Sequence, residues 1–214
     1  MKRHFAIIIA ILLGATLACQ ATTPTNESDV LFQDDFSDPN SGWDKIATEG
    51  GITNYEDGIY RIFVDQASTD VWANPGLDFS DVIIEVSAKK VGGADDNDFG
   101  VLCRSVDTNN FYFFIISSDG YYGIGKVVDG QQSLIGMDAM EPSEVIKKGE
   151  EMNWLHAECV GSRLALWVND QKIKQVEDTQ FTQGDVGLIA GSFDTPGTDI
   201  HFDNFSVRTP AVEE

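Results

Sequence analysis

Residues 111–128 read FYFFIISSDGYYGIGKVV, and they carry the clearest structural pattern in the sequence. Its first part, 111–118, is rich in aromatic and β-branched residues and is apolar on both faces, as in a buried strand. Asp119-Gly120 supplies the residue types that a tight primed turn requires, and 121–128 continues as a second β-rich run. We therefore expect a buried β-hairpin here.

Short β-rich runs, separated by Gly, Asp and Asn, recur on both sides of this hairpin. Residues 81–90 (DVIIEVSAKK) alternate apolar and polar side chains, and 153–160 (NWLHAECV) and 163–169 (RLALWVN) flank a Gly161-Ser162 turn. No segment has a convincing apolar period of 3.6 residues, and the only helical candidate is a turn near residues 143–148. About a dozen such strands predict an all-β fold, an antiparallel β-sandwich or barrel.

The composition is that of a folded and strongly acidic protein. The 214 residues are 42% hydrophobic, and 14 Lys and Arg face 35 Asp and Glu, for a formal net charge of −21. Nucleic-acid binding requires clustered Lys and Arg, so the charge argues against a nucleic-acid partner. It argues equally against a polybasic surface that would bind membranes.

The N-terminus has the pattern of an export signal. Lys2 and Arg3 precede an apolar run, 5–18, which is too short to span a bilayer comfortably. The following Thr16-Leu17-Ala18-Cys19 resembles the lipobox of bacterial lipoproteins, although Thr16 stands where Leu is usual. That resemblance implies a diacylglycerol on the Cys19 thiol, with Cys19 as the mature N-terminus. Ordinary signal cleavage beside an incidental cysteine is the alternative.

The chain therefore divides into four predicted parts. Residues 1–18 are a signal peptide, 19–29 a flexible tether, 30–208 a β-sandwich domain and 209–214 an acidic tail. We expect the protein in the cell envelope, on the extracytoplasmic face, held to the membrane through its N-terminal lipid only.

Two further cysteines, Cys103 and Cys159, remain if Cys19 is lipidated. Strand alternation places both on faces that look core-directed, and an oxidising compartment permits disulfides. We expect a Cys103–Cys159 disulfide. Two buried free thiols that act as small apolar side chains are the alternative.

Several motifs along the domain carry a family resemblance. Residues 31–207 resemble the concanavalin A-like lectin/glucanase jelly roll, and more narrowly its laminin-G-like and 3-keto-disaccharide-hydrolase-like branch. The resemblance implies a jelly-roll β-sandwich, and it is specific for fold rather than for activity. The motifs that carry it are Asp34-Asp35-Phe36, Gly42-Trp43, FGVLCR (99–104), NNFYFFIISSDGYYGI (109–124), NWLHAECVGSRLALWVND (153–170), FTQGDVGLIA (181–190) and HFDNFSV (201–207).

The same resemblance implies a possible structural calcium between the first and last strands. Asp35 and Asp203, with their acidic and amide neighbours, are the candidate ligands, and the loop 94–98 (ADDND) is a second acidic cluster. Chance clustering in so acidic a chain is the alternative reading. No other cofactor is indicated.

Motifs of catalysis are absent from the sequence. There is no HExxH, GxSxG or P-loop pattern, and no E-x-D-x-E strand of the laminarinase type. A glycosidase pair would have to be assembled from different strands, such as Glu85 with Glu158. The sequence leaves enzymatic activity uncertain and leans against it.

A binding surface is the remaining functional prediction. Trp167, His156, Glu158 and Arg104 would share one open sheet face, with Tyr122 and Lys126 as weaker candidates. Aromatic rings with polar neighbours suit sugars, so we expect a noncatalytic module that binds a glycan or another surface component. The alternatives are a glycoside hydrolase of the same fold and a structural or adhesion module that binds a surface protein. In a further alternative, loops cover this face and Trp167 belongs to the core.

Overall fold

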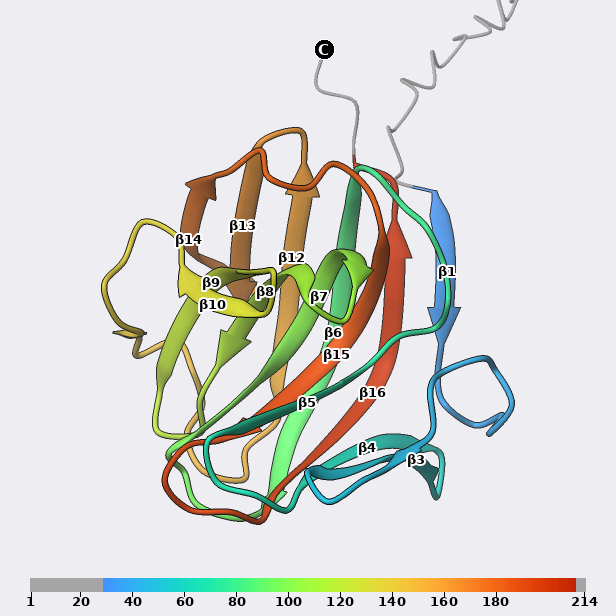
Figure 1. Ribbon diagram of the computed structural model, residues 1–214, viewed down its shortest axis with the longest axis vertical. Coiled ribbons are helices and arrows are strands. Elements are labelled where there is room, and N and C mark those ends of the chain that lie inside the picture. Colours follow the sequence, from blue (N-terminus) through green and yellow to red (C-terminus); the bar gives the residue numbers. More distant parts are fainter. Residues whose placement is uncertain (1–28, 211–214) are drawn as a thin grey trace, which may run out of the picture.

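The computed structural model describes residues 29–210, which form two antiparallel sheets packed face to face and contain no helix (Figure 1). The predicted all-β sandwich is confirmed. The signal peptide, Cys19, nearly all of the tether and residues 211–214 of the tail lie outside the described residues. Among residues 29–210, no helix is long and apolar enough to cross a membrane.

The first sheet has nine strands. Its spatial order is β14 (Gln171–Glu177), β13 (Arg163–Val168), β12 (Asn153–Val160), β6 (Val82–Gly92), β16 (Thr198–Arg208), β4 (Ile59–Val64), β3 (Gly51–Glu56) and β2 (Ile46–Ala47), and β1 (Val30–Asp34) also pairs with β16.

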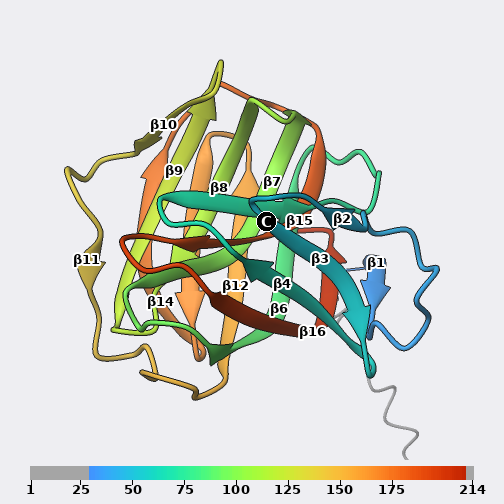
Figure 2. The ribbon, with the colours of Figure 1, turned by 60° about the horizontal axis from the view of Figure 1, so that its bottom comes forward.

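The second sheet has seven strands and contains the hairpin of residues 111–128. Its order is β10 (Gln131–Leu134), β9 (Tyr121–Val128), β8 (Asn110–Ile116), β7 (Asn97–Asp107), β15 (Asp185–Ser192) and β5 (Thr69–Ala73), with β11 (Glu141–Pro142) beside β9. Strands β8 and β9 pair from Phe111↔Val127 to Ile116↔Tyr122, which confirms the predicted hairpin. Figure 2 shows β10, β9, β8 and β7 next to one another in this sheet.

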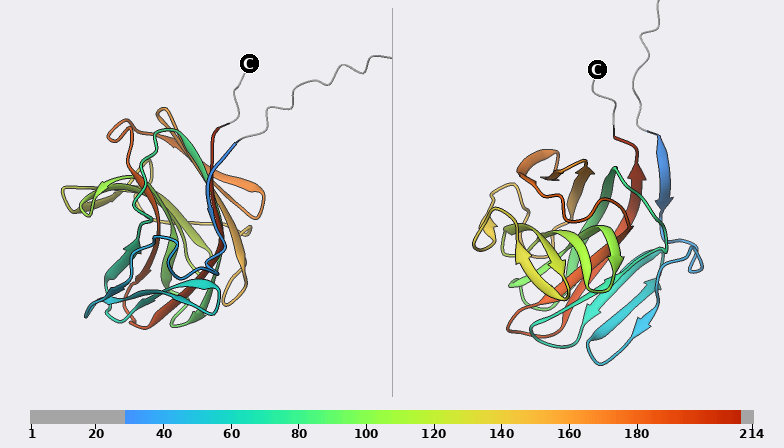
Figure 3. Two further views of the ribbon diagram at one scale, coloured as in Figure 1. Left: turned by 90° about the vertical axis from the view of Figure 1, so that its right-hand side faces the viewer. Right: turned by 45° about the horizontal axis from the view of Figure 1, so that its top comes forward.

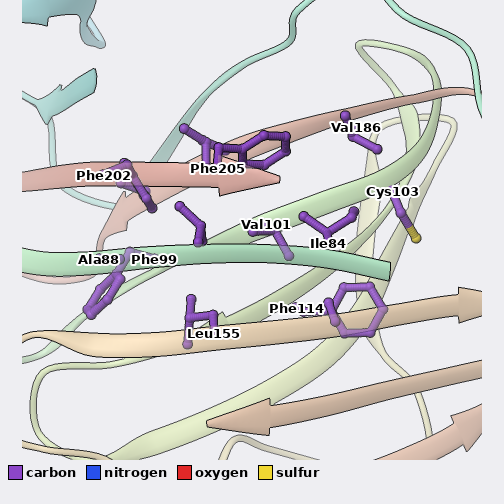
Figure 4. Packing of buried hydrophobic residues seen from close by; sticks show 14 of the residues in the cluster. Ile84, Ala88, Phe99, Val101, Cys103, Phe114, Leu155, Val186, Phe202 and Phe205 are labelled. Carbon is purple, nitrogen blue, oxygen red and sulfur yellow. The ribbon is translucent and has the colours of Figure 1, made fainter. Parts of the chain in front are cut away.

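Alternate side chains of the two sheets meet in one core. Along β12 every second residue is buried, and Leu155 points inward with Ile84 and Ala88 of β6. Phe99 and Val101 of β7 enter from the opposite sheet (Figure 4). Burying such side chains contributes roughly 1.5–3 kcal/mol each, so this layer is the main source of stability.

A disulfide crosses the core between the two sheets. Cys103 of β7 is bonded to Cys159 of β12, with the two Cα atoms 6.7 Å apart and both side chains fully buried. The predicted pairing is therefore present, and the two thiols are not free.

Arg104, the next residue along β7, is a structural residue and not part of a binding face. The register of β7 shifts after Cys103, and Arg104 has φ +49°, so its side chain turns inward and is 2% exposed. Its guanidinium donates to the carbonyls of Ser80, Gly161 and Phe181 at 2.8–3.0 Å and to Asp81 Oδ1 at 2.9 Å. The prediction that Arg104 contacts a ligand is wrong, because all of these contacts tie loops to the sheet.

The two ends of the domain lie side by side. Strand β1 pairs with the last residues of β16, and beyond it the Thr209 amide donates to the Asp29 carbonyl at 2.9 Å. Figures 1 and 3 show both ends at the same end of the sandwich. The connection 193–197, which precedes β16, lies at the opposite end, since the eleven residues of β16 separate it from Arg208.

Candidate functional site

The outer face of the seven-stranded sheet is hollowed. A cavity of about 480 Å³, called the hollow below, is lined by both edge strands, β5 and β10, and by strands between them. Because β5 and β10 stand at opposite ends of the strand order, the sheet must curve around this space. The lining residues are Ser68, Thr69, Asp70, Asp98, Ile115, Gln132, Ser133, Leu134, Met140, Ser192, Phe193 and Asp194.

An apolar layer borders the hollow on the outer side of the sheet. Its buried members are Leu102, Phe111, Phe113, Ile115 and Ile189, and Trp72, Val127, Leu134 and Met140 pack on them. Strand β8 supplies three of these residues, which explains why its sequence is apolar on both faces. A Cβ at Gly125 would lie 2.2 Å from Phe113 Cζ, so the glycine leaves room for that ring.

Two carboxylates converge at one end of the hollow. Asp70 of β5 and Asp98 of β7 are both register partners of Gly191, which lies between them on β15. A Cβ on Gly191 would lie 2.2 Å from Asp70 Oδ1 and 2.4 Å from Asp98 Oδ2. The two oxygens can be no further apart than these two distances together. The absence of a side chain at Gly191 is what allows the pair to form.

Neither carboxylate of this pair has a hydrogen-bond donor among residues 29–210. Asp98 is only 3% exposed and nonetheless lines the hollow. Burial, reinforced by the charge of Asp70, holds the pKa of Asp98 well above its usual range, and burial raises the pKa of Asp70 to about 6. The pair therefore keeps a proton at pH values where exposed carboxyls have lost theirs. It can accept hydrogen bonds from hydroxyl groups, or exchange a proton with a bound molecule.

The outer face of the nine-stranded sheet brings together three of the predicted ligand-binding residues. His156 of β12 lies with its Nε2 3.6 Å from Glu158 Oε1 and its Nδ1 3.4 Å from Glu85 Oε1. The Trp167 ring of β13 packs 4.7 Å from the imidazole, centroid to centroid. Trp167 is half-buried, and Lys172 Nζ lies 4.8 Å from the centre of its ring.

Neighbouring cations already neutralise this charged group. Glu85 accepts from Arg208 Nε at 3.2 Å, and Glu158 lies 3.3 Å from Arg163 Nη2. Burial lowers the pKa of His156, but interactions with the Glu158 and Glu85 carboxylates outweigh burial and raise it to about 9. The interaction with His156 in turn lowers the pKa of both glutamates. Each of these charges thus has an ion-pair partner within the protein, although His156 Nε2 lies too far from Glu158 to form a hydrogen bond.

Tyr122 and Lys126 do not join that face. Both lie on β9 of the other sheet, and Tyr122 is 7% exposed within the core, with its hydroxyl donating to Glu141 Oε2 at 2.7 Å. Lys126 is paired with Asp178 at 2.5 Å. Their prediction as ligand contacts beside Trp167 is wrong, because residues 121–128 belong to the opposite layer of the sandwich.

The predicted calcium ligands Asp35 and Asp203 belong to separate local turns. Asp35 accepts from the Ser37 amide at 3.1 Å, and Asp203 Oδ1 accepts from the Asn204 amide at 2.7 Å, so each carboxylate closes its own local turn. Within residues 29–210, no three His, Cys, Asp or Glu side chains are grouped so as to hold a metal ion.

Sequence reasoning missed the Asp70–Asp98 pair. Asp98 belongs to the acidic 94–98 cluster, which was interpreted only as a possible calcium loop. The sequence of β5, TDVWA, did contain a signal for this site. Asp70 and Trp72 alternate with Val71 and Ala73, which places a carboxylate beside an aromatic ring on one strand face.

Comparison with known proteins shows the fold but not the family. No protein family and no curated protein matches the sequence. The structure is similar to the carbohydrate-binding module CBM66 from Bacillus subtilis, with 19% identity, a TM-score of 0.65, and coverage of 79% of this chain and 96% of that chain. It is also similar to the catalytic domain of an endo-1,3-β-glucanase (laminarinase) from Thermotoga petrophila RKU-1, with 11% identity, a TM-score of 0.61, and coverage of 88% and 100%. A protein of unknown function with a galectin-like fold from Bacillus subtilis has 9% identity and a TM-score of 0.64, with coverage of 87% and 100%.

Proposed function

We propose that the protein is an exported, lipid-anchored module that binds a glycan in the hollow of the seven-stranded sheet. The observation that carries the proposal is the Asp70–Asp98 pair, in which Asp98 is buried, Asp70 is half-buried and neither carboxyl accepts a hydrogen bond from residues 29–210, in a cavity that also has an apolar border. Sugars have the matching chemistry, since their C–H faces pack on apolar side chains and their hydroxyls donate to carboxylates. The similarity in fold to a carbohydrate-binding module supports this choice.

The hollow takes precedence over the Trp167 face for a physical reason. A ligand in the hollow could donate to Asp70 and Asp98, which line the hollow and accept no hydrogen bond from residues 29–210. A ligand at His156 and Glu158 would have to displace ion pairs that already exist. Binding at the hollow therefore yields the larger net gain.

A polysaccharide array can show which of the two faces binds the glycan. The full chain, purified in mild detergent, is probed as the native protein and as two variants, Asp98→Asn and Trp167→Ala. Asp98→Asn exchanges an acceptor oxygen for an amide, and we expect glycan binding to weaken about 100-fold, because the ligand loses the hydrogen bonds that it would make with the Asp98 carboxyl. Trp167→Ala should bind like the native protein. The reverse result would move the site to the nine-stranded sheet, and no binding to any glycan would favour an adhesion module.

Hydrolysis is a second candidate function, favoured by the raised pKa of both members of the pair. A retaining glycosidase uses one protonated and one ionised carboxyl, and the Asp70 and Asp98 carboxyls lie beside one another on either side of Gly191. Release of reducing sugar by the native protein, lost in Asp98→Asn, would establish hydrolysis. Binding of the same polysaccharide without release would leave the module noncatalytic.

The lipid anchor has its own test. Cys19→Ser should transfer the protein from the membrane fraction to the soluble fraction and abolish labelling by radioactive palmitate. A native protein that takes up no label would contradict the anchor without affecting the glycan site.

A further inference from the structure

We infer that the hollow selects uncharged sugars, with two neighbouring hydroxyls of one sugar donating to Asp70 and Asp98, and excludes glycans that carry carboxylates or sulfates. This inference rests on the proposed function and adds the substrate class to it. It follows from the charge of the lining, the placement of the two oxygens and the depth of Asp98.

The lining of the hollow carries charge of only one sign. Its ionisable residues are Asp70, Asp98 and Asp194, and no Lys, Arg or His is among the lining residues. An anionic sugar would therefore meet like charges at short range in a partly dry site, without a cation to compensate. Hydroxyl and amide groups of Ser133, Gln132 and their neighbours supply the remaining polar contacts for a neutral ring.

The two carboxylate oxygens are placed for two donors from one ligand. Asp70 Oδ1 and Asp98 Oδ2 both lie close to the point that a Cβ on Gly191 would occupy. A single donor group of the protein does not reach this point, because no described residue donates to either carboxylate. Neighbouring hydroxyls on one sugar ring are a compact pair of donors, and the hydrogen bond to the ionised member of the pair would be charge-assisted.

The depth of Asp98 makes the requirement for donors strict. Asp98 is 3% exposed, so a ligand that displaces water from the hollow without donating would leave its carboxyl buried and unpaired. Such a site rejects analogues that lack the donor more strongly than an apolar pocket does. Replacing hydroxyls by carboxylates removes donors and adds repulsion at the same time.

The experiment compares each neutral polymer with its own oxidised form. Laminarin, galactan, mannan and fructan are titrated into the full chain in mild detergent, beside derivatives whose primary hydroxyls have been oxidised to carboxylates. We expect at least one neutral polymer to bind and its oxidised form to bind at least 10-fold more weakly. The backbone amide resonance of Gly191 should shift with the neutral polymer, because it lies under the carboxylate pair.

Two variants test the origin of the selectivity. The double variant Asp70→Asn/Asp98→Asn should weaken neutral binding and bring the ratio of neutral to oxidised affinity close to one. Glu85→Gln neutralises a carboxylate on the opposite face, and it should leave both affinities and their ratio unchanged. Thermal melting of each variant separates a loss of binding from a loss of fold.

The outcomes distinguish this inference from the proposed function. If neutral and oxidised polymers bind equally and both are lost in the double variant, the hollow is the site but the selectivity is overturned. If none of the polymers binds, or if binding survives the double variant, the proposed function fails together with the inference.

Discussion

The outer faces of the two sheets hold carboxylates in opposite states. On the nine-stranded sheet, Glu85 and Glu158 are held by His156 and by neighbouring arginines. On the seven-stranded sheet, Asp98 is buried, Asp70 is half-buried, and neither has a donor within residues 29–210. The first group contributes to the stability of the fold, and the second reduces it. Binding capacity is therefore expected where partners are missing rather than where charged and aromatic side chains are most numerous.

The largest expected change in stability comes from removing the disulfide that links the two sheets. Replacing both Cys103 and Cys159 by Ser should lower the free energy of unfolding by about 2–5 kcal/mol, because the cross-link restricts the unfolded chain. Urea denaturation followed by tryptophan fluorescence measures the change. Equal stability of native protein and variant would show that the sheets are held by packing alone, and a change confined to one face would show that the faces unfold separately.

Neutralising one carboxylate on each face should change the free energy of unfolding in opposite directions. Asp70→Asn removes a charge whose pKa burial raises to about 6, so at pH 7 it should raise the free energy of unfolding by roughly 2 kcal/mol. Glu158→Gln removes a paired charge and should lower the free energy of unfolding by about 1 kcal/mol, because solvent screens this ion pair. Denaturant midpoints of the two variants, measured side by side, test the comparison directly. It fails if both variants shift in the same direction.

The two faces should also differ in their pH dependence. The folded pKa of Asp70 lies above its unfolded value of 3.8, so the native state binds more protons, and stability falls as the pH rises from about 4 past 6. His156 has a folded pKa of about 9, so its contribution is complete below its unfolded value of 6.5 and is lost as the pH rises through 9.

Two variants test these two pH ranges separately. The stability difference between native protein and His156→Gln should be largest near pH 6 and should shrink by pH 10. The difference for Asp70→Asn should instead grow between pH 4 and pH 7. A His156 contribution that stays constant up to pH 10 would contradict the assigned network.

The smallest change in stability is expected for Arg208, at the edge of the ion pairs around Glu85, His156 and Glu158. Arg208 lies at the end of β16 and is more than one-third exposed where it pairs with Glu85. Arg208→Ala should lower the free energy of unfolding by less than about 1 kcal/mol and leave glycan binding unchanged. A larger loss, seen as a clear shift in the thermal midpoint, would mean that the nine-stranded face depends on the complete network.

Local patterns in the sequence predicted the fold and one of the two faces. The hairpin of 111–128 depends on a turn dipeptide and on residues that suit strands, and both act within a few positions. The approach of His156 to Trp167 follows from the Gly161-Ser162 turn, because the turn sets the register of β12 and β13. Alternation within a strand and a short turn are sufficient for such contacts.

The sequence could not predict features that depend on distant pairing or on a bulge. Asp70 and Asp98 meet only because β15, from the end of the chain, inserts between β5 and β7. Arg104 was assigned to the wrong surface because the register of β7 shifts beside it, which strict alternation does not anticipate. The interpretation of Tyr122 failed because alternation does not say to which layer a strand belongs.

The pairing of β1 with the end of β16 has a mechanical consequence under the proposal that Cys19 carries a lipid anchor. Asp29 is ten positions after Cys19, so the chain between them can reach at most about 35 Å. The hollow includes the Phe193–Asp194 connection, at the end of the sandwich away from that tether, and would face outward from the envelope. Tension between a polymer bound in the hollow and the N-terminal anchor would act on the domain along the axis of β1. The hydrogen bonds between β1 and β16 would then be loaded together in shear, rather than opened one after another.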